Sequence, residues 1–197
     1  DRSAERLYLI DERGREVRPD QALLLYLKLL GGEGGKVVVP ITATSQVEEV
    51  VGGRFEVVRT PATLPELTRA AAGENVVFAG APGGGYVFPA FLPAYDAIAA
   101  LCKLLELLAP VGDPLSKLVA ELPRPTLVHR QVQCPWALKG TVMRVLNERY
   151  ANGNVDTTDG IKIFDARGWV QVLPDGDEPT IHLYAEGETP AESEELE

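Results

Sequence analysis

Residues Asp159 to Glu186 read DGIKIFDARGWVQVLPDGDEPTIHLYAE, and this stretch decides the fold of the second half of the chain. Up to Leu173 it carries β-branched and aromatic residues around a short turn at residues 166–168, a pattern that predicts two strands. Residues 180–185 alternate apolar and polar side chains and predict a third strand. The stretch therefore predicts an antiparallel sheet with a sharp turn, Leu173–Pro179, between adjacent strands.

The turn, with the sequence Pro-Asp-Gly-Asp-Glu-Pro at residues 174–179, combines an anion-binding shape with acidic side chains. A sharp turn presents backbone N–H groups outward, and such a nest of amides can hold an anion. Here the turn carries three carboxylates of its own, from Asp175, Asp177 and Glu178. Binding of Ca²⁺ or Mg²⁺ is one alternative for an acidic turn, and a solvated turn without a ligand is the interpretation we favour.

The composition is that of an ordinary soluble globular chain, with 197 residues of which 45% are hydrophobic and 24% charged. We find no apolar run of transmembrane length and no signal-peptide pattern at the start. The net charge of −10 and the lack of a basic patch argue against partners such as nucleic acids and anionic membranes. Residues 186–197 form an acidic tail with six Glu and no Lys or Arg.

Residues 94–108 predict a helix that is apolar almost all round, and such a helix is expected to pack on more than one neighbour. Its charges include Asp96 and Lys103, for which we expect a helix cap or a structural ion pair. The helix carries Cys102, while Cys134 lies in a strand pattern, and the two do not make a metal-ligand spacing. We expect both thiols to be buried and reduced, which fits a cytoplasmic protein.

Pro123-Arg124-Pro125 marks the expected domain boundary, because two prolines interrupt both helix and sheet. From a first strand at Leu7–Ile10, strands and helices alternate up to this point, which predicts an α/β domain over residues 1–123. Its parallel sheet would lie between helices on both faces, in three layers. Residues 124–197 predict a small α+β domain with an antiparallel sheet and a terminal helix. Three helices are expected to begin at capping boxes, Ser45/Glu48, Thr63/Glu66 and Thr189/Glu192.

The stretch from Asp159 onward resembles the last domain of the α-D-phosphohexomutases, the family of phosphomannomutases and phosphoglucomutases. In that family a DG-[IV]-K strand and a GW strand lead into the phosphate loop R-P-S-G-T-E-P, and the next strand ends in an A-E pair. The present chain keeps DGIK at residues 159–162, Gly168-Trp169, and Ala185-Glu186. In the loop it keeps both prolines, the glycine and the Glu, but replaces Arg by Leu173, Ser by Asp175 and Thr by Asp177, while Gly176 is retained.

The resemblance covers the whole chain and implies that residues 1–123 correspond to the third domain of the family and the remainder to the fourth. Residues 88–96 and 128–136 further resemble the mutase-like C-terminal regions of proteins that also carry a mannose-1-phosphate guanylyltransferase domain. In the family two domains come first, and the first of them carries the catalytic phosphoserine. The resemblance therefore implies that the partners of this chain are such N-terminal domains or a linked nucleotidyltransferase domain.

Three further substrate-facing segments of the family are altered in this chain, namely the metal loop, a basic residue and the sugar-recognition loop. The family's Mg²⁺ loop, D-G-D-x-D-R, falls on residues 1–6, where Ser3 replaces the middle Asp and Glu5 the third, so that only weak Mg²⁺ binding is expected. The basic residue of its T-x-V-G-x-[KR] motif falls on Pro65. The carried-over positions, all degenerate, are Asp1 and Glu5 for the metal, and Arg6, Ala81, Gly83, Gly84, Leu173, Asp175, Gly176 and Asp177 for the substrate.

The sugar-recognition loop of the family, G-E-x-S-G, falls on residues 80–85, where Ala81 and Gly83 stand in place of the Glu and the Ser. Neither replacement can bond a sugar hydroxyl through its side chain. As a generic motif a Gly-rich loop is more often a flexible turn than a phosphate cradle. His129 and His182 lie in strand patterns, and we interpret both as strand-face residues, because no Ser, Cys or Asp lies at a spacing that predicts a pair.

Our first hypothesis is the C-terminal half of a phosphohexomutase-like protein that has lost catalysis, contains no catalytic residue, needs no cofactor and does not bind a phosphosugar. Its role would be structural or regulatory in sugar-phosphate and sugar-nucleotide metabolism. One alternative is a working half of a Mg²⁺-dependent mutase, with Asp1 and Glu5 holding the ion. Another is a protein-interaction module that uses the acidic tail at residues 186–197 or the exposed edge of the second domain.

Overall fold

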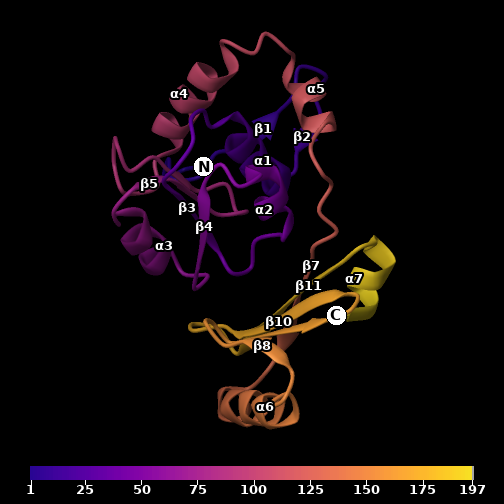
Figure 1. Cartoon of the computed structure of the whole chain (residues 1–197). Coiled ribbons are helices and arrows are strands. Elements are labelled where there is room, and N and C mark those ends of the chain that lie inside the picture. Colours follow the sequence, from indigo (N-terminus) through magenta and orange to yellow (C-terminus); the bar gives the residue numbers. More distant parts are fainter. Residues whose placement is uncertain (197) are drawn as a thin grey trace. The chain divides into compact units, whose positions relative to one another are not determined.

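The computed structural model describes residues 1–196 and divides the chain into two compact units, Asp1–Pro125 and Thr126–Glu197. Each unit has its own sheet and its own helices (Figure 1). The division falls at the end of the Pro123-Arg124-Pro125 segment, slightly beyond the boundary expected from the sequence. In the described part of the chain, no helix combines the length and the apolar character needed to cross a membrane.

The first unit holds a sheet of strand order β4-β3-β5-β6 and five helices. A separate two-stranded hairpin, β1 with β2, precedes the first helix. The elements are β1 (Leu9–Ile10), β2 (Glu16–Val17), α1 (Pro19–Leu29), β3 (Lys36–Pro40), α2 (Gln46–Val51), β4 (Glu56–Thr60), α3 (Leu64–Ala71), β5 (Val76–Gly80), β6 (Tyr86–Val87), α4 (Ala97–Leu108) and α5 (Leu115–Ala120).

The sheet of the first unit lies between helices on both faces. Strand β3 is apolar along its length and runs parallel to β4 and β5. Its Val37 and Val39 pack in the cluster that contains α1, while Val38 between them packs with Leu67 and Ala71 of α3. This alternation of side chains is the reason why a continuous apolar strand needs cover on both faces. The predicted three-layer α/β domain is confirmed.

The sheet differs from the expectation at two places. Strand β6 runs antiparallel to β5 at the edge, so the sheet is mixed. The predicted first strand does not join the sheet, because the turn after it lets Leu9 pair with Val17 in a local hairpin. In that turn the Asp11 carboxylate accepts the backbone N–H groups of Arg13 and Arg15 and thereby closes the hairpin.

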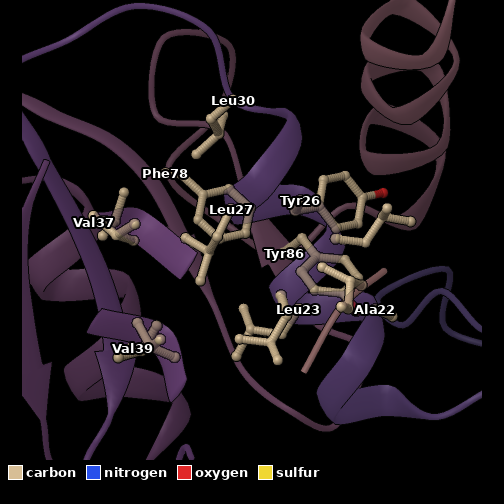
Figure 2. Packing of buried hydrophobic residues seen from close by; sticks show 14 of the residues in the cluster. Ala22, Leu23, Tyr26, Leu27, Leu30, Val37, Val39, Phe78 and Tyr86 are labelled. Carbon is tan, nitrogen blue, oxygen red and sulfur yellow. The ribbon is translucent and has the colours of Figure 1, made fainter. Parts of the chain in front are cut away.

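The core of the first unit contains a group of aromatic rings next to α1. Tyr26 and Tyr86 have ring centroids 4.3 Å apart, and Phe78 lies 5.8 Å from Tyr26 (Figure 2). The Tyr26 hydroxyl donates to the carbonyl of Ala100 at 2.8 Å and so joins α1 to α4. Among the described residues the buried Tyr86 hydroxyl has no hydrogen-bond partner.

Helix α4 corrects two expectations from the sequence. It buries Ala97, Ala100 and Leu104 against the first unit, but other apolar side chains on it are exposed, so it is not covered all round. Cys102 is exposed rather than buried, whereas Cys134 is buried as expected. The Asp96 carboxylate caps the helix by accepting two backbone N–H groups, and Lys103 pairs with Glu106 one turn away.

The second unit is an antiparallel sheet of strand order β7-β11-β10-β9-β8, as the sequence predicted for an α+β domain. Helix α6 packs on one face through Val142, Met143 and Leu146, which meet Ile161 and Ile181. The elements are β7 (Val128–Gln133), α6 (Trp136–Arg149), β8 (Asn154–Asp156), β9 (Ile161–Asp165), β10 (Gly168–Pro174), β11 (Thr180–Gly187) and α7 (Pro190–Leu196).

Residues 186–196 of the acidic tail belong to the fold of the second unit. Glu186 is buried and accepts the indole N–H of Trp169 at 2.9 Å. The capping box before α7 is formed, since Thr189 and Glu192 each bond the backbone N–H of the other. At the other two, Ser45 and Thr63 stand at the N-caps of α2 and α3 as predicted, but their side chains make no cap hydrogen bond.

Candidate functional site

The turn between β10 and β11 is a nest of backbone amides that its own side chain fills. The carboxylate Oδ1 of Asp175 accepts the backbone N–H of Asp177 and that of Glu178, both at 2.7 Å. These two amides face the same oxygen, which is the arrangement that otherwise binds an external anion. The nest therefore already contains an anion, covalently attached to the turn.

The opposite side of the turn is held by a buried cation. Lys139 of α6 donates through Nζ to the carbonyl of Asp175 at 2.6 Å and also to the carbonyl of Glu178. The same ammonium lies 3.9 Å from the centre of the Trp136 ring. A buried ammonium needs such partners, because its removal from water is otherwise too costly. The amides of Asp177 and Glu178 and the carbonyls of Asp175 and Glu178 thus have hydrogen-bond partners within the unit.

A chain of side chains continues from the turn across the sheet to its edge. His182 Nε2 lies 2.8 Å from Asp175 Oδ2, and His182 Nδ1 lies 2.9 Å from His129 Nε2. The two imidazoles are nearly coplanar, with 18° between their planes. The His129 ring also stacks on Tyr184, with centroids 4.4 Å apart and 10° between the planes. The series Asp175, His182, His129 therefore connects the turn to edge strand β7.

Among these three hydrogen-bonded side chains, Asp175 has a strongly lowered pKa. The hydrogen bond from His182, followed by those from the amides of Asp177 and Glu178, lowers the pKa of the Asp175 carboxyl to about 2. An ionised carboxylate only accepts hydrogen bonds, so the proton between Asp175 and His182 belongs to the imidazole Nε2. When His182 is neutral, its Nδ1 then accepts from His129 Nε2.

The pairing of His182 with an aspartate corrects the interpretation from the sequence. Asp175 and His182 are seven residues apart in the chain, and this spacing alone does not predict a contact. The two side chains meet because the turn brings β10 and β11 together. Lys139 was missed as well, because it lies on α6, far from the turn in the sequence. Alternation along β11 predicts that His182 and Tyr184 share a face, and only the register of β7 adds His129 to them.

The other three positions of the turn that the resemblance singled out, Leu173, Gly176 and Asp177, supply no positively charged side chain for a ligand. Leu173, where the resemblance predicts a lost Arg, pairs directly with His182 across the sheet. Gly176 has open space around the position of a Cβ and no positive φ, so its backbone does not depend on glycine. Asp177 contributes its backbone N–H to the nest, while its carboxylate adds a further negative charge beside it.

In the first unit, the structure brings the predicted metal loop and the predicted sugar loop together. Arg6 forms an isolated antiparallel bridge with Gly85, and the Leu7 N–H donates to the Gly84 carbonyl at 2.9 Å. Gly84 has φ of +87°, and a Cβ there would lie 2.8 Å from the Leu7 carbonyl oxygen. A Cβ on Gly85 would lie 2.4 Å from the Tyr95 ring. Both glycines are required by close approach.

Arg6 lies close enough to Tyr95 to influence the pKa of its phenol. Burial raises the pKa of Tyr95 to about 12, and the cation of Arg6 opposes this shift. Ala81 and Gly83 complete the loop without a polar side chain, and around Gly83 no atom lies within 4 Å of a Cβ. The loop thus provides backbone groups alone for contact with a ligand.

Residues 1–6 do not fit a Mg²⁺ site in the arrangement seen. Asp1 Oδ1 accepts the N–H groups of Glu5 and Arg6, and the Ser3 hydroxyl lies 3.0 Å from Asp1 Oδ2 and 3.3 Å from Glu5 Oε2. Mg²⁺ requires several oxygen ligands in octahedral geometry. In residues 1–196 no group of three or more His, Cys, Asp or Glu is arranged to hold a metal ion.

The loop after β4 likewise offers no cation for a ligand. Pro65 lies in α3, and the nearby basic residue, Arg59, is fully engaged within the protein. Its guanidinium bonds both carboxylate oxygens of Glu48 and the carbonyls of Ala43 and Thr44. The carboxyl ends of parallel strands are where ligands of α/β domains bind, and here that edge contains no uncommitted positive charge from this segment.

Solved structures share the fold of the chain. A phosphoglucomutase/phosphomannomutase family protein from Burkholderia thailandensis superposes with a TM-score of 0.80 over 98% of this chain, at 20% identity, covering 42% of that structure. An Aspergillus fumigatus N-acetylphosphoglucosamine mutase in complex with GlcNAc-6P and magnesium gives a TM-score of 0.64 over 98% of this chain, at 17% identity, covering 45% of that structure.

Sequence relatives extend over the entire chain but are much longer than it. A probable phosphoglucosamine mutase of Methanopyrus kandleri is 36% identical over 203 residues, which is 100% of this chain and 44% of the relative. A phosphoglucomutase/phosphomannomutase of Thermococcus kodakarensis is 31% identical over 199 residues, 99% of this chain and 44% of the relative. The chain thus spans less than half the length of these curated relatives.

A match to a family profile covers more than half of the chain. Residues 18–126 match the profile described as "Phosphoglucomutase/phosphomannomutase, alpha/beta/alpha domain III". The matched region runs from α1 to the end of the first unit and therefore contains the complete mixed sheet. The chain belongs to the phosphoglucomutase/phosphomannomutase family and contains its domain III.

Proposed function

We propose that this chain is the C-terminal part of a phosphohexomutase-like protein whose phosphate-binding turn has been closed by its own carboxylate, leaving a structural or regulatory role. The observation that carries the proposal is the position of Asp175 Oδ1, 2.7 Å from the amide nitrogens of both Asp177 and Glu178. A phosphate could reach these amides only after displacing an oxygen that His182 also helps to hold in place.

Charge makes that displacement unfavourable. The resemblance to the family places an Arg at Leu173, where a guanidinium would give bidentate bonds to phosphate. Without it, an incoming dianion would meet the carboxylates of Asp175 and Asp177, which stand where the family has Ser and Thr. Each like charge at about 4 Å costs roughly 1 kcal/mol even in a medium as polar as water. Loss of attraction and gain of repulsion thus act in the same direction.

The proposal is supported by three other altered segments in the first unit. The metal loop has Ser3 and Glu5 in place of Asp, Pro65 stands in place of a basic residue, and Ala81 and Gly83 lack the polar side chains expected in the sugar loop. With the turn, four substrate-facing segments are altered together, whereas the drift of one would leave only a weakened enzyme. As partners we propose the N-terminal domains of such a protein, or a linked nucleotidyltransferase of sugar-nucleotide synthesis, on the basis of the resemblance to guanylyltransferase fusion proteins.

The first test is a calorimetric titration of the chain with phosphosugars, with and without Mg²⁺. Because several relatives are named phosphoglucosamine mutases, the ligands are glucosamine 6-phosphate and glucosamine 1-phosphate, with glucose 1,6-bisphosphate as a third. We expect no saturable heat up to millimolar ligand. Saturable binding that depends on Mg²⁺ would contradict the proposal.

A pair of variants then tests the role of the carboxylate. Asp175→Ser empties the nest, while Asp177→Ser removes the same charge from the same turn without emptying it. We expect a larger gain in phosphosugar affinity from Asp175→Ser than from Asp177→Ser, and the largest gain when Leu173→Arg is added. Equal gains in the two single variants would show that net charge alone excludes the ligand.

The alternative of a working Mg²⁺-dependent mutase half has one observation in its favour. The Ser3 hydroxyl draws the carboxylates of Asp1 and Glu5 together, and an ion could replace it as the bridge. In that case Mg²⁺ binding should be detectable by calorimetry and should disappear in Asp1→Asn. A phosphosugar titration of the unaltered chain separates this alternative from the first proposal.

A further inference from the structure

Helix α4 carries two separate apolar stripes. Residues Ala97, Ala100 and Leu104 form the buried stripe, which packs in the first unit beside the Tyr26 hydroxyl bond to Ala100. A second stripe, which we call the outer α4 stripe, consists of Ile98, Leu101, Cys102 and Leu105, at the i, i+3, i+4, i+7 spacing of one helix face. One helix therefore has the sequence of an element packed on two sides.

The outer α4 stripe is exposed in the described chain. Ile98 retains 66% of its accessible surface and Leu105 retains 59%, and Cys102 is exposed as well. Phe91, in the turn before the helix, is 73% exposed. A hollow of about 810 Å³ lies beside this turn and the helix, and its lining includes the apolar Phe88, Phe91 and Ile98 as well as the charged Asp96, Lys103 and Glu106. A contiguous exposed apolar surface of this kind marks an interaction site.

The stripe has no net charge to recruit a charged partner. The charged side chains on the helix, Lys103 and Glu106, also line the hollow beside it, where they pair with each other at 2.8 Å and so offset each other's charge. An apolar helix face is recognised by another apolar surface, through the loss of water from both. A nucleic acid or a phosphosugar would gain nothing from it. The chemistry thus selects a protein surface as the occupant.

The position of the first residues indicates which protein surface. The N–H of Ala97, the first residue of α4, donates to the carbonyl of Ala4 at 2.8 Å. A polypeptide joined at residue 1 therefore arrives beside the start of the outer α4 stripe. The relatives are more than twice as long as this chain, and the domain matched here is numbered the third. The numbering implies that proteins of this family have two domains before the one matched here.

We propose that the outer α4 stripe is the docking surface for an N-terminal phosphohexomutase domain, supplied by the same polypeptide or by a partner. Ile98 and Leu105 are the central apolar contacts, and Phe91 with the adjacent hollow receives an apolar side chain of that domain. The inference does not depend on the closed phosphate turn, since it concerns the other unit and would hold for an active or an inactive protein.

Cys102 provides a direct test, because it lies within the stripe and the second cysteine is buried. Its rate of reaction with a maleimide is measured in the isolated chain and in a chimera. In the chimera, this chain replaces the matched region of the Methanopyrus kandleri relative. We expect at least a tenfold slower reaction in the chimera. The same protection should appear when the chain is mixed with the separately produced N-terminal part of that relative.

Variants show whether slower labelling of Cys102 is caused by docking on the outer α4 stripe or by another change in the chimera. Ile98→Glu with Leu105→Glu should restore fast labelling in the chimera, whereas Ile10→Glu should not. Ile10 is a matched control because it is 68% exposed, apolar and in the same unit, but lies on β1. Fast labelling of the unaltered chain both in a cooperatively folded chimera and in the mixture overturns the proposal. Protection that grows with the concentration of the isolated chain, with a doubled mass, overturns it too and assigns the stripe to self-association.

Discussion

The imidazole Nε2 of His182 lies 2.8 Å from the carboxylate Oδ2 of Asp175, and this contact fixes the orientation of the acidic turn. With Oδ2 held by the imidazole, Oδ1 points at the amides of Asp177 and Glu178. A single carboxylate thus joins strand β11 to the turn and fills the anion-binding nest at the same time. The low pKa of Asp175, about 2, is the electrostatic consequence of these bonds.

The first prediction concerns acid stability. The pKa of Asp175 is about 2 in the folded chain against an ordinary value of 3.8, so the ionised form stabilises the fold above 3.8. This contribution is lost progressively as the pH falls from 3.8 through 2. Asp175→Asn should therefore lower the free energy of unfolding at pH 6 and flatten its decline at acidic pH.

Tryptophan fluorescence in urea measures this effect, because both tryptophans, Trp136 and Trp169, belong to the second unit. Asp177→Asn is the control, since Asp177 contributes its backbone rather than its carboxylate to the nest. It should keep the loss of stability between pH 3.8 and 2 that depends on Asp175. Equal slopes for the unaltered chain and Asp175→Asn would contradict the assignment of the low pKa.

The second prediction concerns the cation beneath the turn. Lys139 is 8% exposed and bonds two turn carbonyls. Lys139→Met should destabilise the second unit by about 2–3 kcal/mol, because the hydrogen bonds of a charged group to two carbonyls are lost together with its contact to the Trp136 ring. Arg144→Met on the same helix removes an exposed pair with Glu148 and should cost less than about 0.5 kcal/mol. Similar losses for the two variants would refute the role of Lys139.

A third prediction compares two buried tyrosines that differ in hydrogen bonding. The Tyr26 hydroxyl bonds the Ala100 carbonyl, so Tyr26→Phe should destabilise the first unit by roughly 0.5–1.5 kcal/mol. The hydroxyl of Tyr86 has no partner among the described residues, so Tyr86→Phe should be neutral or stabilising. Urea unfolding followed by circular dichroism checks both. A loss from Tyr86→Phe as large as that from Tyr26→Phe would show a bond that the structure lacks.

A fourth prediction concerns the Gly-rich loop beside residues 1–6. Gly85→Ala would place a methyl group 2.4 Å from the Tyr95 ring and should cost about 1–3 kcal/mol, the range for overpacking. Gly83→Ala in the same loop meets no atom within 4 Å and should change stability by less than about 0.5 kcal/mol. Thermal unfolding of the two variants measures the difference. If Gly85→Ala melts like the unaltered chain, the close packing of the loop on Tyr95 is wrong.

Local sequence patterns predicted much of the fold. The apolar run Val37–Val39 is typical of a strand covered on both faces, and the alternation of Ile181 and Leu183 is typical of a strand with one apolar face. Both signals are local, because side-chain direction repeats every two residues in a strand. The predicted apolar character of α4 is confirmed as well, but within residues 1–196 its Ile98, Leu101 and Leu105 stay exposed.

By itself, the sequence determined the elements, the two-part order and the acidic character of the turn, since each depends on residues near one another in the chain. Only the tertiary structure decided what the turn does with its charge. Lys139 reaches it from α6, and His129 reaches His182 from edge strand β7. These contacts depend on strand register and helix packing. Both are determined by the burial of a whole face of the sheet or helix, so no single residue in the sequence predicts them.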